Sequence, residues 1–152
     1  METSLQILVA LYALLNFTTF IYSLHKVKNK KGAFERVPQP LIVTGSFVWA
    51  DHVVFGLFWT LASLLVLYFQ DFLLMLLIIS VFWLVRSVGE SMYWFLQQFS
   101  QINRNPPESF RIHKIFHNSS VWFVHQIYWQ ALTVTTIITT LALAALWVKE
   151  KI

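Results

Sequence analysis

The chain has 152 residues, of which 57% are hydrophobic, 17% are aromatic and only 12% are charged. This charged share is about half of the usual value for soluble domains, and the mean hydropathy is +0.62. A soluble protein of this size has too little interior to hide so much apolar surface, so we predict a polytopic membrane protein in which residues 1–152 form one domain. Cysteine is absent, which excludes disulfide exchange, thiolate catalysis and cysteine-ligated metals.

Four apolar runs are each long enough for the roughly 20 residues that cross a hydrocarbon core. They cover about residues 5–24, 47–69, 72–99 and 121–148. No basic segment precedes the first run and no small-residue cleavage site follows it, so we expect a retained helix and not a secretory signal. The sequence therefore predicts an all-α fold, an integral membrane four-helix bundle with four transmembrane helices.

Basic residues gather in the connections after the first and third runs. The first connection holds four lysines and Arg36 against Glu35, and the second holds Arg104, Arg111 and Lys114 against Glu108. By the positive-inside rule, both loops lie in the cytoplasm and both termini lie outside, in a multi-pass protein of the plasma or inner membrane. We expect contact with anionic lipids of the inner leaflet and no nucleic-acid partner, the lipid contacts being made by Lys26, Lys28, Lys30, Lys31, Arg111 and Lys114.

The third run carries charged and polar residues inside a stretch that is otherwise apolar. A charged side chain at the bilayer centre costs roughly 2.5–3.5 kcal/mol on insertion scales, so it rarely persists without a use. At 100° per residue, these side chains fall within a sector of about 80° on a helix. The members of this stripe are Arg86, Glu90, Tyr93, Gln97 and Gln101.

A short amphipathic helix is predicted before the fourth span, over about residues 106–118. Asn105 fits an N-cap, Pro106 the first helical position, and Glu108 the N3 position. Basic residues share one face of this helix, although Phe110 breaks the pattern. We expect it to lie on the inner leaflet.

Each of the other runs also has one polar side. The first run contributes Asn16, the second Asp51 and His52, and the fourth His125 followed by a row of threonines. Polar stripes on membrane helices avoid lipid by facing each other. We therefore predict a polar site that opens to the cytoplasm, and its ligand- or ion-binding candidates are Arg86, Glu90, Tyr93, Gln97, His125, Asp51, His52 and Asn16.

Two alternatives to a ligand site stay open. Arg86 and Glu90 are one helical turn apart, so they can neutralise each other in a purely structural core. His52 and His125, on separate helices at similar depth, have the arrangement that a bis-histidine haem b needs in a helical bundle. Apart from this alternative, no cofactor and no metal are predicted.

Three functions fit the polar site. We favour binding or transport of a small solute or ion, in which Glu90 titrates or binds the ion and Arg86 tunes it. The first alternative is a membrane-embedded enzyme that acts on a lipid or another amphiphile, with Glu90 or His125 as general acid or base. The second is a non-catalytic subunit or assembly partner of a larger complex, and a homo-oligomer is also compatible with the sequence.

Helix packing is expected to depend on bulky and polar contacts. Gly45, Gly56 and Gly89 are the only glycines near the predicted spans, and no GxxxG motif occurs. Small residues are the usual means of close approach between membrane helices. We therefore expect aromatic side chains to fill the space between them.

Overall fold

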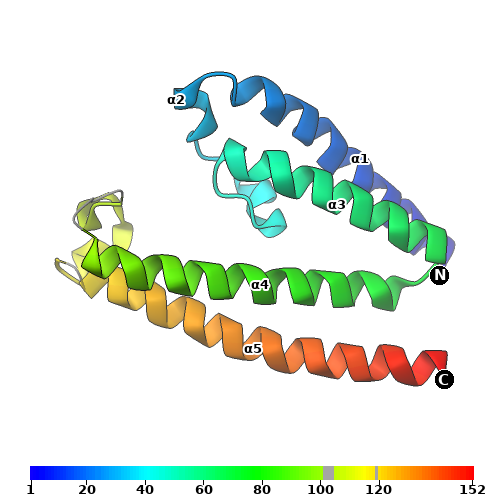
Figure 1. Cartoon of the computed structure of the whole chain (residues 1–152). Helices are drawn as coiled ribbons and strands as arrows, with labels where there is room; N and C mark the ends of the chain where they lie inside the picture. The colour runs from blue at the N-terminus through cyan, green and yellow to red at the C-terminus, as the bar shows by residue number, and fades with distance from the viewer. Residues whose placement is uncertain (101–104, 119) are drawn as a thin grey trace. The chain divides into compact units, whose positions relative to one another are not determined.

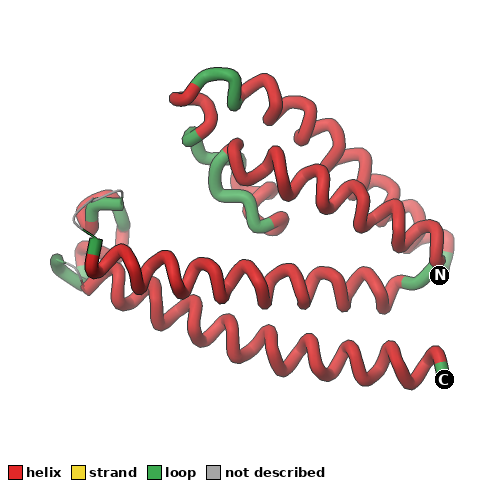
Figure 2. Tube along the Cα trace, viewed as in Figure 1, coloured by secondary structure: helices red, strands yellow, loops and turns green. Residues whose placement is uncertain are grey.

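The computed structural model describes residues 1–100, 105–118 and 120–152. Within these ranges the fold is all-α, as predicted, and Figure 2 shows only helices and loops. The long helices are α1 (Thr3–Lys26), α3 (Trp49–Phe69), α4 (Phe72–Phe99) and α5 (Ser120–Lys151), and the short ones are α2 (Lys30–Ala33), η1 (Gln39–Thr44), η2 (Pro107–Ser109) and η3 (Arg111–Lys114).

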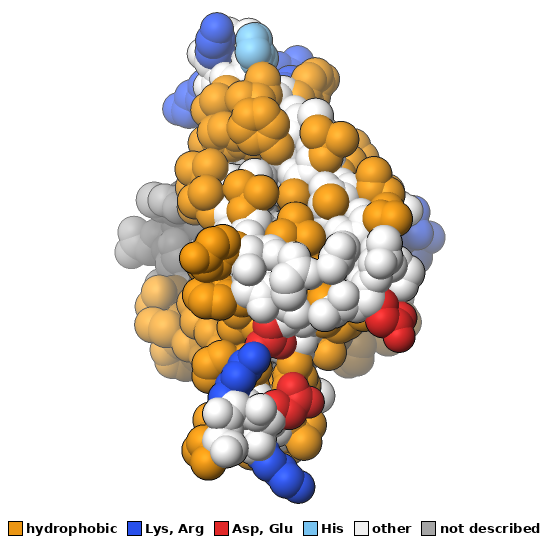
Figure 3. All heavy atoms as spheres, turned by 90° about the vertical axis from the view of Figure 1, so that its right-hand side faces the viewer, with side chains coloured by type: hydrophobic (Ala, Val, Ile, Leu, Met, Phe, Trp, Pro, Cys, Tyr) orange, Lys and Arg blue, Asp and Glu red, His pale blue; other side chains and the backbone are white. Residues whose placement is uncertain are grey.

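The four long helices coincide with the four predicted spans. Among the described residues, these are the helices long and apolar enough to cross a membrane. Large apolar side chains stay exposed along all of them. Figure 3 looks onto the helix ends at the right-hand side of Figure 1, where hydrophobic side chains lie beside charged ones. An apolar outer surface of this kind suits a lipid bilayer, because water solvates it poorly.

The chain divides into two compact units, Met1–Ile78 and Ile79–Ile152. The arrangement of all four spans in one domain stays a prediction. In the first unit, α1 and α3 lie side by side and antiparallel (Figure 1). Their shared core alternates apolar and small polar side chains: Val9, Ala13, Asn16 and Ser23 of α1 against Gly56, Trp59, Ser63 and Val66 of α3.

Gly56 sets the distance between α1 and α3. A Cβ atom at this position would lie 3.1 Å from the Cβ atom of Phe20 and 3.2 Å from the carbonyl oxygen of Asn16. A side chain at this position would therefore require its neighbours to shift by a few tenths of an ångström. The expectation that small residues play no leading part in packing is therefore wrong for this pair. A single glycine allows this close approach without a GxxxG repeat.

The connection between α1 and α3 folds back along α3. Its ends meet where the amide of Val37 donates to the carbonyl of Phe47 (3.2 Å), and Gly45 ends η1 in the left-handed region, with φ of 79°. Trp59 Nε1 then donates to the carbonyl oxygen of Thr44 (2.9 Å). Trp59 comes ten residues after the first residue of α3, about 15 Å along the helix at 1.5 Å per residue. The carbonyl of Thr44, at the end of η1, therefore lies beside α3 and not beyond its N-terminus.

In the second unit, α5 lies antiparallel along α4 (Figure 1). Contacts between the two helices run from the Ser80 and Thr140 hydroxyls, 2.6 Å apart, to the hydroxyl of Thr133, which donates to Ser87 Oγ (3.0 Å). At the other end Trp94 stacks on His125. The predicted polar sides of the third and fourth spans thus face each other.

The segment before α5 contains two short 3-10 helices, η2 and η3, where the sequence predicted one helix over 106–118. Phe110 separates them in extended conformation, with φ of −102° and ψ of 138°. Its side chain packs against Trp94 of α4 (ring centroids 5.6 Å apart). The residue that breaks the amphipathic pattern therefore breaks the helix, because its aromatic ring packs against the helix pair.

We expect Gly56→Ala to lower the stability of the protein and Gly89→Ala to leave it unchanged or slightly higher. The added methyl group at Gly56 meets neighbours at 3.1–3.2 Å, whereas at Gly89 it meets no atom within 4 Å. Overpacking costs roughly 1–3 kcal/mol, while Gly to Ala in an exposed helix contributes up to about 1 kcal/mol of stability. Thermal unfolding in detergent measures both. Equal midpoints for the two variants would contradict the close approach.

We expect Trp59→Phe to release the segment around η1. Removing the indole N–H leaves the buried carbonyl of Thr44 without this donor, at a cost of roughly 1–3 kcal/mol. Because the chain has no cysteine, Val43→Cys provides a single label site, and it should react faster with a water-soluble maleimide in the Trp59→Phe background. Trp83→Phe is the control substitution, and Phe34→Cys, in the basic loop, the reference site. Unchanged labelling of Val43→Cys would show that Trp59 does not hold the segment.

Candidate functional site

The predicted site residues fall into two groups, one in each unit. Asn16, Asp51 and His52 belong to the α1–α3 pair, and the others belong to α4 and α5: Arg86, Glu90, Tyr93, Gln97 and His125. Gln101 and Arg104 lie outside the described residues. The convergence of both groups into one site stays a prediction.

His52 is fully buried and hydrogen-bonded at both ring nitrogens. Its Nε2 lies 2.7 Å from Thr19 Oγ1 of α1, and its Nδ1 lies 2.9 Å from Ser46 Oγ. Thr44 Oγ1 is 3.0 Å from Ser46 Oγ, within the same buried cluster. We call these four residues, Thr19, Thr44, Ser46 and His52, the His52 cluster.

The hydroxyl groups of the cluster can satisfy a neutral imidazole completely. Thr19 Oγ1 donates to the carbonyl of Leu15 (2.7 Å). In the tautomer that carries its proton on Nε2, His52 donates from Nε2 to Thr19 Oγ1 and accepts at Nδ1 from Ser46. The cluster thereby connects α1, α3 and the connecting segment that contains η1. A network in which every member is satisfied holds its elements in one arrangement, so His52 has a structural role.

The hydrogen bonds of His52 also test whether this residue could be an axial ligand of a haem. A haem iron would need one ring nitrogen of His52 as its axial ligand. Both nitrogens face hydroxyl groups at hydrogen-bonding distance. The residues around His52 therefore do not fit a haem.

Asp51 and Asn16 also make contacts within the first unit. Asp51 Oδ2 accepts from the amides of Phe47 (3.0 Å) and Val48 (3.4 Å), so it caps the N-terminus of α3. Asn16 is fully buried, and its Nδ2 donates to the carbonyl of Tyr12 (2.8 Å). Its Oδ1 is buried without a hydrogen-bond partner.

On α4, Arg86 and Glu90 form the predicted ion pair. Arg86 Nη2 lies 2.9 Å from Glu90 Oε1, and the two side chains are 20% and 13% exposed. The other carboxylate oxygen, Oε2, accepts a hydrogen bond from Trp94 Nε1 (3.2 Å). The hydrogen-bonded group around the ion pair therefore extends along α4 by one helical turn, to Trp94.

Trp94 connects the ion pair to His125 of α5. The two rings are stacked, with centroids 4.6 Å apart and planes inclined by 19°. Phe110 closes over both rings, 4.9 Å from the His125 ring. We call Arg86, Glu90, Trp94, Phe110 and His125 the α4–α5 polar site. Its distinctive feature is His125 Nε2, which is buried without a hydrogen-bond partner.

The other predicted residues of α4 lie toward its C-terminal end. The side chain of Gln97 is buried, and the adjacent Gln98 donates from Nε2 to Gln126 Oε1 (2.6 Å). Tyr93 accepts a hydrogen bond from Asn105 Nδ2. These amide and phenol groups join α4 to α5 and to the loop at the same end as the α4–α5 polar site.

Sequence reasoning missed Trp94, which it assigned to the membrane interface, and it missed Thr44 and Ser46 in the loop. A signal for Trp94 was present, because it follows Glu90 by four residues and an i,i+4 pair shares one helix face. No such signal existed for Thr44 and Ser46. Their proximity to His52 depends on the backward fold of the segment.

Comparison of the chain with models of protein families, with curated proteins and with solved structures found no match in any of the three.

Proposed function

We propose that this protein is a multi-pass membrane protein that binds a small solute or ion at the α4–α5 polar site, with Arg86, Glu90 and His125 as its binding groups. The observation that carries this proposal is His125 Nε2, a buried ring nitrogen without a hydrogen-bond partner. Leaving such an atom unsatisfied costs roughly 1–3 kcal/mol. A ligand that hydrogen-bonds or coordinates this nitrogen recovers that cost.

The neighbouring groups give the site donors and acceptors. Glu90 offers carboxylate oxygens and Arg86 offers guanidinium N–H groups, and the two neutralise each other. The pair can therefore open toward a charged or dipolar solute without leaving a net charge in an apolar environment. Trp94 and Phe110 enclose His125 with aromatic rings, which exclude water and strengthen electrostatic contacts.

The contrast with the His52 cluster supports this assignment. Both nitrogens of His52 have hydroxyl partners, whereas Nε2 of His125 has none. His52, which is buried, and His125, which is half-buried, thus differ in the hydrogen bonding of their ring nitrogens. We assign His52 to the architecture and His125 to the ligand.

Location supports the same function. Glu90, Trp94 and Gln97 lie in the C-terminal half of α4, and Phe110 comes from the basic loop that follows. By the positive-inside rule this end faces the cytoplasm. A solute would therefore enter from the cytoplasmic side, beside Phe110.

We expect Glu90→Gln to weaken binding at this site by roughly tenfold to a hundredfold, since a hydrogen bond to a charged group contributes about 1.5–3 kcal/mol. The measurement is native mass spectrometry of the full chain, purified gently in detergent, in which the wild type should carry an added mass. Glu108→Gln is the matched control, because it removes an exposed carboxylate of the neighbouring loop. His125→Phe keeps the aromatic stack and should also lose the added mass.

Thermal unfolding of each variant separates a lost ligand from a lost fold. If the wild type and folded Glu90→Gln carried the added mass at the same occupancy, Glu90 would not be part of the binding site and the proposed site would be rejected. A wild type that carries no added mass, and whose proteoliposomes give the same proton and alkali-cation flux as folded Glu90→Gln, would reject the function.

A further inference from the structure

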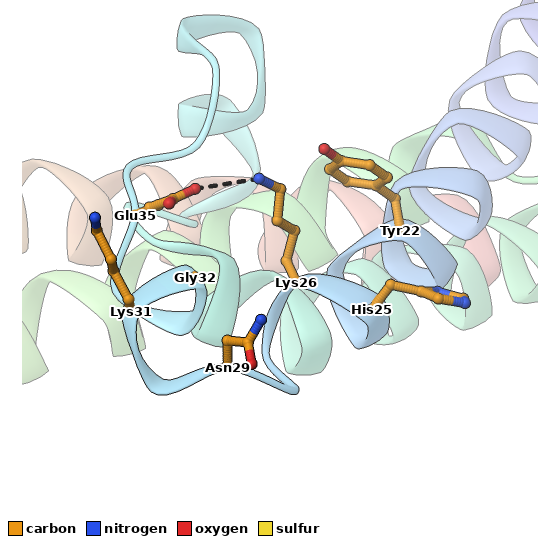
Figure 4. A pocket seen from close by; sticks show the side chains of 7 residues that line it. All are labelled: Tyr22, His25, Lys26, Asn29, Lys31, Gly32 and Glu35. Atoms are coloured by element: carbon orange, nitrogen blue, oxygen red, sulfur yellow. Dashed lines mark hydrogen bonds and ion pairs between the residues drawn. The ribbon is translucent and has the colours of Figure 1, made fainter.

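A second polar feature lies at the end of α1, where the chain turns into the basic loop. It is a pocket of about 340 Å³ between the last turn of α1 and α2. Figure 4 shows Lys26 extending to Glu35, with the side chains of Asn29 and Lys31 around the same space. Tyr22 lines the pocket on the side of the helix.

The backbone of the loop builds this pocket. Gly32 is buried, and a Cβ atom there would collide with the carbonyl oxygen of Lys26. The loop therefore returns directly onto the end of α1, where any larger residue would push it away. This return brings Asn29 and Lys31 to the same pocket as Lys26, although their positions in the chain lie three and five residues further on.

The charges of the pocket favour an anion. Lys26 Nζ is 3.2 Å from Glu35 Oε2 and 5.8 Å from the centre of the Tyr22 ring. Two lysines against one glutamate leave a net charge of +1 among these side chains. Glu35 pairs with the Lys26 ammonium group and so competes with an anion for it, and Asn29 adds a neutral amide donor. An ammonium group is a common ligand for phosphate.

The surroundings favour a lipid as the source of that anion. The pocket lies at the end of a helix long and apolar enough to cross a membrane. Ile21 and Leu24, in the last turns of α1, are 39% and 38% exposed and offer apolar surface beside the pocket. A phospholipid would place its phosphate among the lysines and its acyl chains along this surface.

We propose that the pocket lined by Tyr22, His25, Lys26, Asn29, Lys31, Gly32 and Glu35 is a binding site for a phosphate group, carried by an anionic phospholipid. This inference is independent of the α4–α5 polar site. The lysines of the loop differ in their position relative to the pocket. Lys26 and Lys31 line it, whereas Lys28 and Lys30 lie outside its lining.

The four lysines provide a matched experiment on the full chain. Lys26→Gln/Lys31→Gln and Lys28→Gln/Lys30→Gln remove the same charge from the same loop. Retention of phosphatidic acid over phosphatidylcholine is measured by native mass spectrometry, with inorganic phosphate as competitor. We expect the first pair to lower phosphatidic acid retention by roughly tenfold or more, and the second pair by less than about threefold.

Two further variants keep the test independent of folding. Glu35→Gln removes the acid that competes for Lys26, so retention should rise several-fold, which a misfolded protein would not give. Gly32→Ala changes no charge and should lower retention, because it displaces the loop. Displacement of the lipid by millimolar inorganic phosphate would support a phosphate site whose ligand is free phosphate, and resistance to it would support the lipid. If both double variants lost the same share of phosphatidic acid retention, or if neither lost any, the proposed phosphate site would be refuted.

Discussion

The fold depends on one constraint: inside a hydrocarbon layer, each buried polar group must find its partner within the protein. The long helices satisfy this constraint through their own backbone bonds. The segment around η1 is different, because a short 3-10 helix beside α3 has fewer such bonds. Trp59 supplies a donor to the carbonyl of Thr44, and His52 contacts Ser46. These contacts permit irregular backbone to lie along a membrane helix.

The same constraint distinguishes the polar side chains by role. Threonine and serine hydroxyls mostly donate to carbonyls one turn earlier, so they pack as small residues. His52 is satisfied from two sides and joins three segments. His125 is enclosed by aromatic rings and retains a buried nitrogen without a partner. Buried polar groups that are satisfied, such as His52, stabilise the fold, whereas the unsatisfied Nε2 of His125 is the atom at which we propose a ligand.

Charged side chains at the helix ends show a similar division. Lys26 is fixed by Glu35 and by the return of the loop at Gly32, whereas Lys28 extends from the surface. Counting charges treats these lysines alike and gives only an orientation in the membrane. Their geometry places Lys26 and Lys31 at a pocket and leaves Lys28 and Lys30 outside it.

The sequence by itself determined the four apolar helices, because their length and hydropathy are properties of contiguous residues. It also identified the Arg86–Glu90 pair, whose spacing of one turn is local. Only the tertiary structure decided that Gly56 brings α1 against α3, that Trp94 connects Glu90 to His125, and that Thr44 reaches Trp59. Those contacts join residues distant in the chain, and periodicity along one helix carries no information about which neighbour its polar face will meet.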